Sequence, residues 1–257
     1  MNILCLHGRN QSGKVFETQL AAPIQAMRDE ESSVSFDFAD GPIWSPETPV
    51  DKQATYKFFE NSNAAAISKA HEWLGKKLES DGPYDGVIGF SDGATLVSSY
   101  LQHRQWYSDE ESQPFKFAIF ISAGVSLSVL GDLGACAAIR VVQEAELRCR
   151  DGLSPLPAHA SQKERAMYDS DHCFGLNLNR VPREFKIRIP TVHVWGTKDP
   201  CFPAYIHLVG LCDPYIRQVY QHHDAHEVPQ KREDTDRLGP LFVWCMRRAV
   251  WPGQSQV

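Results

Sequence analysis

The sequence predicts an α/β fold, a mostly parallel sheet with helices on both faces, in a single domain over residues 1–257. Short apolar segments alternate along the chain with segments whose apolar residues recur at helical spacing. The segment at 117–121 is apolar throughout, which is typical of a parallel strand covered on both faces. The length of 257 residues, with 42% hydrophobic and 23% charged residues, suits one large globular domain.

In the first half of the chain, buried strands are expected at 2–6 and 34–38, and the glycines after the first strand suit a turn with inward-pointing N–H groups. Between these strands, one set of apolar residues at helical spacing predicts a single helix; its members are Phe16, Leu20, Ile24 and Met27. A second set at helical spacing predicts a helix before residue 82; its members are Ile67, Ala70, His71, Leu74 and Leu78. Residues 41–60 are expected to be irregular, because prolines interrupt them.

In the second half, residues 125–185 carry weaker patterns and are expected to form a small insertion that caps the site, with an ordinary helical crossover as the alternative. Strands are expected at 191–195 and 216–220. The last stripe predicts a C-terminal helix with Pro240 in its first turn; its apolar residues are Leu238, Leu241, Phe242, Cys245 and Ala249.

The segment 84–96 carries the strongest motif in the chain. Gly89-Phe90-Ser91-Asp92-Gly93 fits the G-x-S-x-G pattern of a nucleophile elbow, with an apolar strand before it and an amphipathic helix after it. We expect both glycines to press against neighbouring backbone where a Cβ would not fit. The turn would hold the Ser91 hydroxyl at a helix N-terminus, where backbone N–H groups favour negative charge.

A serine nucleophile needs a base, and the base needs an orienting carboxylate. Loops that follow predicted strands carry Ser91, Asp199 and His226, and parallel strands bring such loops to one edge of the sheet. Their order along the chain is that of the α/β-hydrolase fold. The other candidates that the sequence offers are Asp213 and Asp224 for the acid, and His222 and His223 for the base.

The oxyanion hole is expected to use two backbone N–H groups, that of Asp92 after the nucleophile and that of Arg9 in the loop after the first strand. The sequence assigns no role to the Arg9 side chain. Large aromatic residues among 41–60 either pack beneath a loop or line an acyl pocket, and the pocket candidates are Trp44, Phe58 and Phe59.

Charge and composition argue against several functional classes. The net charge is −6 and no basic stripe stands out, which argues against nucleic acid and anionic membranes as partners. We expect no signal peptide and no membrane span, and the seven cysteines, lacking paired spacing, indicate reduced thiols in a cytoplasmic protein. His159, His172 and Cys173 lack a second ligand pair at zinc spacing, so no metal is expected.

Four segments together resemble the FSH-type family of serine hydrolases, whose members include fungal esterases and the human ovarian-cancer-associated hydrolase. They are Leu6-His7-Gly8, Gly89-Phe90-Ser91-Asp92-Gly93-Ala94, Gly196-Thr197-Lys198-Asp199 and His226-Glu227-Val228-Pro229. The family often has two glycines before the histidine; Asp224 and Ala225 stand there in this chain, so a differently shaped histidine loop is expected. The fungal branch of the family includes thiohydrolases that release polyketide chains from a synthase carrier domain.

The residues and the resemblance together predict an enzyme that cleaves an ester or thioester through an acyl-enzyme, with no cofactor. The resemblance implies a small-molecule acyl substrate, with a polyketide synthase carrier domain as a potential partner. Two alternatives stay open. One is an acyltransferase or lactone-forming cyclase that uses the same triad, and the other is a non-catalytic binding protein with a hydrolase-like fold. The acyl chain, the leaving group, the pathway and the oligomeric state are not fixed by the sequence.

Overall fold

The computed structural model describes residues 1–46, 54–61, 63–107, 113–124, 158–159, 162, 186–199 and 201–250. Most of the expected cap over 125–185 lies outside these residues. Of its metal candidates, His159 is exposed on the surface, and His172 and Cys173 are not described. Among the described residues, no group of three or more His, Cys, Asp or Glu side chains is placed to hold a metal ion. No helix in this part of the chain is both long and apolar enough to span a membrane.

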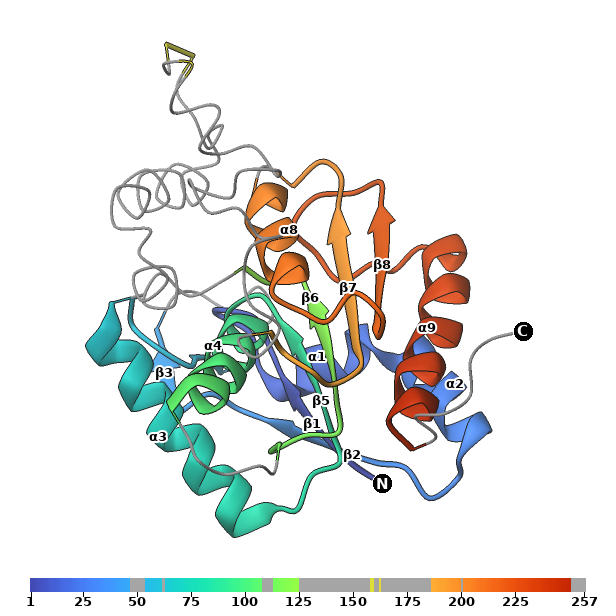
Figure 1. Cartoon of the computed structure of the whole chain (residues 1–257), viewed down its shortest axis with the longest axis horizontal. Coiled ribbons are helices and arrows are strands. Elements are labelled where there is room, and N and C mark those ends of the chain that lie inside the picture. The colour runs from blue at the N-terminus through green and yellow to red at the C-terminus, as the bar shows by residue number, and fades with distance from the viewer. Residues whose placement is uncertain are drawn as a thin grey trace.

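Six parallel strands form the central sheet in the order β2-β1-β5-β6-β7-β8 (Figure 1). The bounds are Asn2–Leu6 for β1, Ser35–Ala39 for β2, Gly86–Phe90 for β5, Phe117–Ile121 for β6, Thr191–Gly196 for β7 and Arg217–His222 for β8. Every residue of β5, β6 and β7 is buried, as the apolar runs predict for central strands. The predicted strands and the parallel sheet are therefore confirmed.

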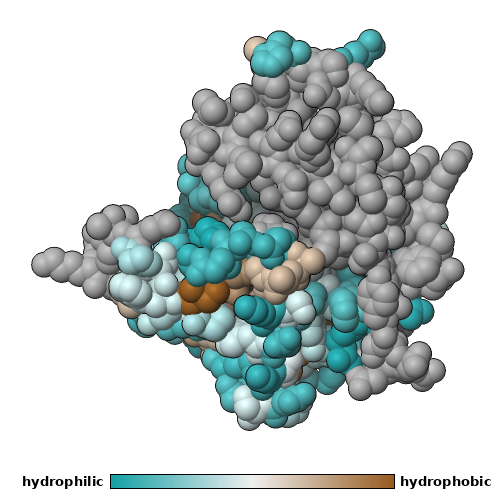
Figure 2. Space-filling view, turned by 90° about the vertical axis from the view of Figure 1, so that its left-hand side faces the viewer, coloured by the Kyte–Doolittle hydropathy of each residue, from teal (hydrophilic) through white to brown (hydrophobic). Residues whose placement is uncertain are grey.

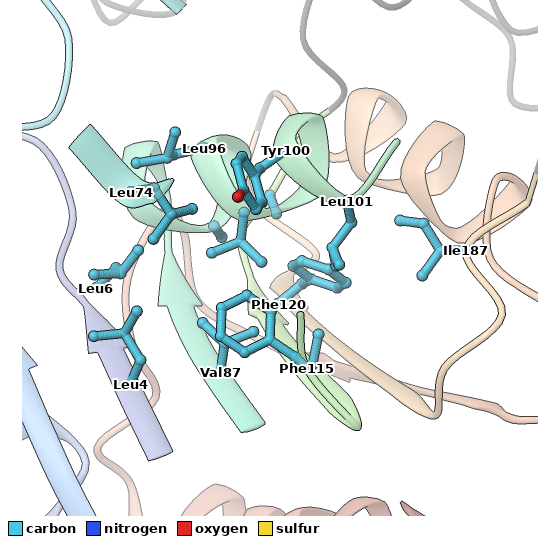
Figure 3. Close-up of a cluster of buried hydrophobic side chains, with 14 of the residues drawn as sticks. Leu4, Leu6, Leu74, Val87, Leu96, Tyr100, Leu101, Phe115, Phe120 and Ile187 are labelled. Carbon is cyan, nitrogen blue, oxygen red and sulfur yellow. The ribbon is translucent and has the colours of Figure 1, made fainter. Parts of the chain in front are cut away.

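Helices cover both faces of this sheet (Figure 1). One face carries α3 (Ala64–Asp81), α4 (Asp92–Tyr107) and α8 (Phe202–Gly210), and the other carries α1 (Gly13–Gln19), α2 (Ala21–Glu30) and α9 (Arg232–Val250). Figure 3 shows Leu101 of α4 pointing toward Phe115 and Phe120, and Leu96 beside Leu74 of α3; Tyr100 also faces α3, where its ring packs against His71. Seen from the α3 side, the described surface is mainly hydrophilic, and strongly hydrophobic residues, coloured brown, are confined to a small patch (Figure 2).

Three predictions about helices and loops were wrong in detail. The stripe from Phe16 to Met27 belongs to two helices, because the chain turns at Leu20, which ends α1 and begins α2. The last helix begins at Arg232, so Pro240 lies inside α9 and not in its first turn. Part of the segment 41–60 is regular, since β3 (Ile43–Ser45) and β4 (Thr55–Lys57) pair as antiparallel strands.

Candidate active site

The turn between β5 and α4 holds Ser91 in a left-handed backbone conformation, with φ at 51°. Such a conformation is strained for a residue with a side chain, and the two flanking glycines make it sterically accessible. A Cβ at Gly89 would lie 2.6 Å from the Ala94 Cα, and one at Gly93 would lie 2.4 Å from the Leu6 carbonyl oxygen. The expected close approach of both glycines to backbone is thus confirmed.

The loops after β7 and β8 place two further groups at the same edge of the sheet. The His226 Nε2 lies 2.9 Å from the Ser91 Oγ, and the His226 Nδ1 lies 2.7 Å from the Asp199 Oδ2. The three groups form one continuous chain of hydrogen bonds. The His226 ring also packs against the Phe90 ring at a centroid distance of 5.4 Å, which limits its rotation.

Asp199 is 1% exposed, whereas the His226 side chain is 43% exposed. Burial by itself would raise the pKa of the Asp199 carboxyl. Hydrogen bonds from His226, from the Tyr205 hydroxyl and from the backbone N–H of Cys201 outweigh that effect, so the pKa of Asp199 is lowered. The carboxylate is therefore ionised at neutral pH, and it favours the tautomer of His226 that carries its proton on Nδ1.

Tyr205 has no counterpart among the residues singled out from the sequence. It lies in α8, is 4% exposed, and its hydroxyl is 2.6 Å from Asp199 Oδ2 and 2.9 Å from His226 Nδ1. The apolar run at 202–209 is a sequence signal for α8, although the proline that precedes it is typical of a loop. No local motif marks the hydroxyl as a neighbour of the acid and the base.

The loops that carry Asp199 and His226 are joined by backbone hydrogen bonds, Thr197 N–H to the His222 carbonyl at 2.8 Å and Lys198 N–H to the Asp224 carbonyl at 3.1 Å. Neither Asp224 nor Ala225 has a positive φ, so the absence of glycine there creates no left-handed strain. The Asp224 carboxylate pairs with Lys231, which anchors the loop just before His226.

The competing candidates lie elsewhere. His222 is buried in β8 and accepts a hydrogen bond from the backbone N–H of Asp224, and His223 is exposed. Asp213 is buried and accepts a hydrogen bond from the backbone N–H of Tyr215. Ser91 instead contacts His226, and His226 contacts Asp199, so these two are the groups brought to the serine.

The pocket candidates separate into two environments. Phe58 and Phe59 are 1% and 2% exposed and belong to the core beneath α3 and α4, and Phe58 packs against the His7 ring. Trp44 lies on β3 and is 64% exposed. The Arg9 side chain, to which the sequence assigned no role, forms an ion pair with Asp92 at 2.7 Å.

A doubly covered parallel sheet, with a serine on a strained turn and a histidine and an aspartate after later strands, defines an α/β-hydrolase. The family described as "Serine hydrolase (FSH1)" matches residues 1–238. The chain therefore belongs to this family of serine hydrolases, as the resemblance predicts.

Three relatives among curated proteins come from fungi. Esterase alnB of Emericella nidulans is 26% identical, covering 96% of this chain and 97% of its own. Esterase FPY3 of Fusarium mangiferae is 28% identical, covering 91% of each chain. Hydrolase phiM of a fungal species is 31% identical, covering 94% of this chain and 93% of its own.

Two solved structures illustrate the similarity of fold. Esterase PE8 aligns with a TM-score of 0.54 at 15% identity, covering 95% of this chain and 92% of its own. SOBER1 of Arabidopsis thaliana aligns with a TM-score of 0.52 at 16% identity, covering 96% and 98%. At these identities the likeness establishes the α/β-hydrolase fold alone.

Proposed function

We propose that this serine hydrolase cleaves an acyl ester or thioester through an acyl-enzyme on Ser91. The observation that carries the proposal is the continuous hydrogen-bond chain from the Ser91 Oγ through His226 to Asp199. A serine hydroxyl is a poor nucleophile near neutral pH, and this arrangement supplies the base that activates it.

The distances support a two-step reaction. The Ser91 Oγ attacks the acyl carbonyl while the His226 Nε2 takes the hydroxyl proton; His226 then gives that proton to the departing alcohol or thiol. Water attacks the acyl-enzyme in the second step, with His226 again as base. Asp199 holds the imidazole in orientation and stabilises its charged form throughout.

The oxyanion would be held by the backbone N–H groups of Asp92 and Arg9. Asp92 is the first residue of α4, where N–H groups and the helix dipole favour negative charge. Within the described residues, no group accepts a hydrogen bond from the backbone N–H of Arg9. That donor is therefore open to a substrate oxygen.

For the substrate, we propose an uncharged medium or long acyl chain on a thioester, such as a polyketide chain on a carrier domain. The resemblance to the fungal thiohydrolase branch favours the thioester, and fungal esterases are among the relatives. Trp44 offers an exposed aromatic surface for the acyl group. Phe58 and Phe59 are buried in the core, so they would support the acyl-binding surface from below.

A fluorophosphonate probe tests the nucleophile, because it reacts with an activated serine. We expect labelling of the wild type at Ser91 and none of Ser91→Ala, whose kcat falls by several orders of magnitude. Labelling of Ser91→Ala to the wild-type level would overturn the assignment of the nucleophile.

Matched thioesters and oxygen esters of graded chain length, assayed with the wild type and with Trp44→Ala, test the substrate. Each buried CH₂ contributes about 0.8 kcal/mol, so two matched methylenes raise kcat/KM roughly tenfold. Free acid as the product supports hydrolysis, whereas an ester or lactone would point to acyl transfer or cyclisation. A flat chain-length profile that Trp44→Ala leaves unchanged would exclude the acyl pocket.

A further inference from the structure

The Arg9 guanidinium connects three segments beside Ser91. Its Nε lies 2.7 Å from the Asp92 Oδ2, and its two terminal nitrogens donate to the backbone carbonyls of Phe59 at 3.0 Å and Glu60 at 3.3 Å. The guanidinium also lies over the Phe59 ring, 5.5 Å from its centroid. With side-chain exposures of 24% for Arg9 and 16% for Asp92, this ion pair is largely shielded from water.

These contacts join the two residues whose backbone N–H groups would hold the oxyanion. Arg9 belongs to the loop after β1, and Asp92 begins α4 directly after Ser91. The side-chain ion pair therefore fixes the separation of the two backbone donors. An oxyanion hole depends on donors that are already in place when the negative charge develops.

The loop that carries Arg9 needs such restraint, because the next residue, Asn10, has a left-handed φ of 57°. Ser45 on β3 donates to the Asn10 side chain at 2.9 Å, and the Tyr56 N–H on β4 donates to the Gln11 carbonyl at 2.7 Å. The β3–β4 pair therefore holds the loop at Asn10 and Gln11. The Arg9 side chain attaches the loop to α4 and to the segment after β4.

Charge gives Arg9 a second effect. The Asp92 carboxylate belongs to the residue after the nucleophile, close to where the oxyanion would form. An uncompensated negative charge there would repel the developing oxyanion in a partly buried site. The guanidinium at 2.7 Å neutralises that charge.

We propose that the Arg9 side chain is a positioning group for the oxyanion hole: it fixes the two backbone donors in place and neutralises Asp92. The inference rests on the proposed function, since it assumes chemistry at Ser91. It implies that the Arg9 side chain stabilises the transition state and contributes little to binding of the substrate in the ground state. Its loss should therefore lower kcat and leave KM almost unchanged.

The test uses the full chain with Arg9→Met, Asp92→Asn and the double variant, assayed on one p-nitrophenyl ester. Arg9→Met keeps the backbone N–H but removes the guanidinium beside the Asp92 carboxylate, so we expect kcat to fall by about 10- to 100-fold, with KM within about twofold. The double variant also removes the Asp92 negative charge and should recover several-fold of that loss. Affinity for a boronic acid, which forms a tetrahedral adduct with serine, should fall in parallel with kcat/KM.

Lys14→Met is the matched control, because it removes an exposed ion pair with Glu17 in the neighbouring helix α1, and it should leave kcat and boronic-acid affinity unchanged. If Arg9→Met does not fold, Arg9→Lys serves instead. Its ammonium keeps the charge beside Asp92 but cannot reach both carbonyls at once, so a smaller loss of kcat is expected.

An unchanged kcat in the Arg9 variants, a change confined to KM, or a double variant no faster than Arg9→Met would overturn the positioning role. Fluorophosphonate labelling separates this failure from that of the proposed function. Wild-type protein labelled at Ser91 together with unaffected Arg9 variants would reject the inference alone, whereas no labelling at Ser91 would reject both.

Discussion

The Tyr205 hydroxyl donates a hydrogen bond to Asp199 over 2.6 Å, and it does so at Oδ2, the same carboxylate oxygen that faces the His226 Nδ1. The backbone N–H of Cys201 occupies the other oxygen, Oδ1, at 2.9 Å. Both oxygens of a carboxylate that is 1% exposed are therefore hydrogen-bonded. The same hydroxyl lies 2.9 Å from the His226 Nδ1, so Tyr205 contacts both the acid and the base.

Replacing Tyr205 with Phe should raise the pKa of Asp199, because one of the hydrogen bonds that lower it is lost. We expect a several-fold lower kcat/KM and a free energy of unfolding at pH 7 reduced by about 1.5–3 kcal/mol. A group with a lowered folded pKa stabilises the protein above its unfolded pKa, and this contribution disappears as the pH falls through the folded pKa. Urea unfolding should therefore show a smaller difference from the wild type at acid pH than at pH 7. Tyr215→Phe, at a tyrosine that is 83% exposed, should match the wild type in both assays.

Histidine substitutions distinguish the proposed base from its neighbours. His226→Ala should lower kcat by about 10⁴-fold or more, because Ser91 loses its proton acceptor, while circular dichroism stays that of the folded protein. His223→Ala removes an exposed side chain and should retain full turnover. An inactive His223→Ala beside an active His226→Ala would mean that the base has been assigned to the wrong histidine.

Gly196, the last residue of β7, should not tolerate alanine. A Cβ there would lie 2.1 Å from the Asp224 carbonyl oxygen and 2.2 Å from that of Ala225. Both belong to the loop that carries His226, so relief of the clash would displace the base, and we expect at least a tenfold loss of kcat and a lower Tm. Gly75→Ala in α3 is the control: among the described residues, its Cβ would approach just the Tyr100 hydroxyl of α4, at 3.7 Å, so an equal or higher Tm is expected. Equal activity in both variants would contradict the prediction.

Buried histidines make the free energy of unfolding depend on pH. Burial, and secondarily the charge of Arg217, lowers the pKa of His193 to about 3, and burial lowers that of His207 to about 3. The unfolded chain therefore takes up these protons first, so stability should fall as the pH drops from about 6.5 toward 3, by about 1.4 kcal/mol per pH unit for each group.

His193→Gln removes one of these groups and keeps an amide near the Thr191 Oγ1, which the ring nitrogen contacts at 3.0 Å. Urea unfolding between pH 4 and pH 6 should show a slope that is smaller by up to about 1.4 kcal/mol per pH unit. His223→Gln, at an exposed position, should leave the slope as it is in the wild type. An unaltered slope in His193→Gln would show that this histidine does not drive the acid destabilisation.

Apolar periodicity predicted the strands and most of the helices, but it could not locate the break at Leu20. The stripe from Phe16 to Met27 continues in register across the break, so the pattern itself contains no boundary. The physical cause is Pro23, which has no N–H to donate to the Gln19 carbonyl; the Gln230 side chain donates to that carbonyl at 2.9 Å. A residue more than two hundred positions away thus supplies the missing hydrogen bond.

At Pro240 the prediction placed a helix boundary where the structure has none. Its position suggested the start of a helix, yet α9 continues through it. The carbonyl that lacks its partner belongs to Asp236, and both residues are exposed, so water can satisfy that oxygen. This exposure, which the sequence does not state, helps α9 to continue through Pro240.

The Ser-Asp-His order and the strand ends were enough to select three residues that the fold brings together. The side chains of Tyr205 and Arg9 were missed for a common reason. Each acts across segments that are distant in sequence, on Asp199 from α8 and on Asp92 from the loop after β1. No local spacing encodes such contacts.

The hydrogen bond between Ser91 and His226 joins residues 135 positions apart. It requires β5, β6, β7 and β8 to be paired in register, because the two residues follow strands that are separated by two others in the sheet. Pairings of this sequence separation form late, since chain entropy is lost before the contact is made. Recovery of fluorophosphonate labelling after dilution from urea should therefore follow, and not accompany, the burial of Cys5 in β1, which makes activity a reporter of the last stage of folding.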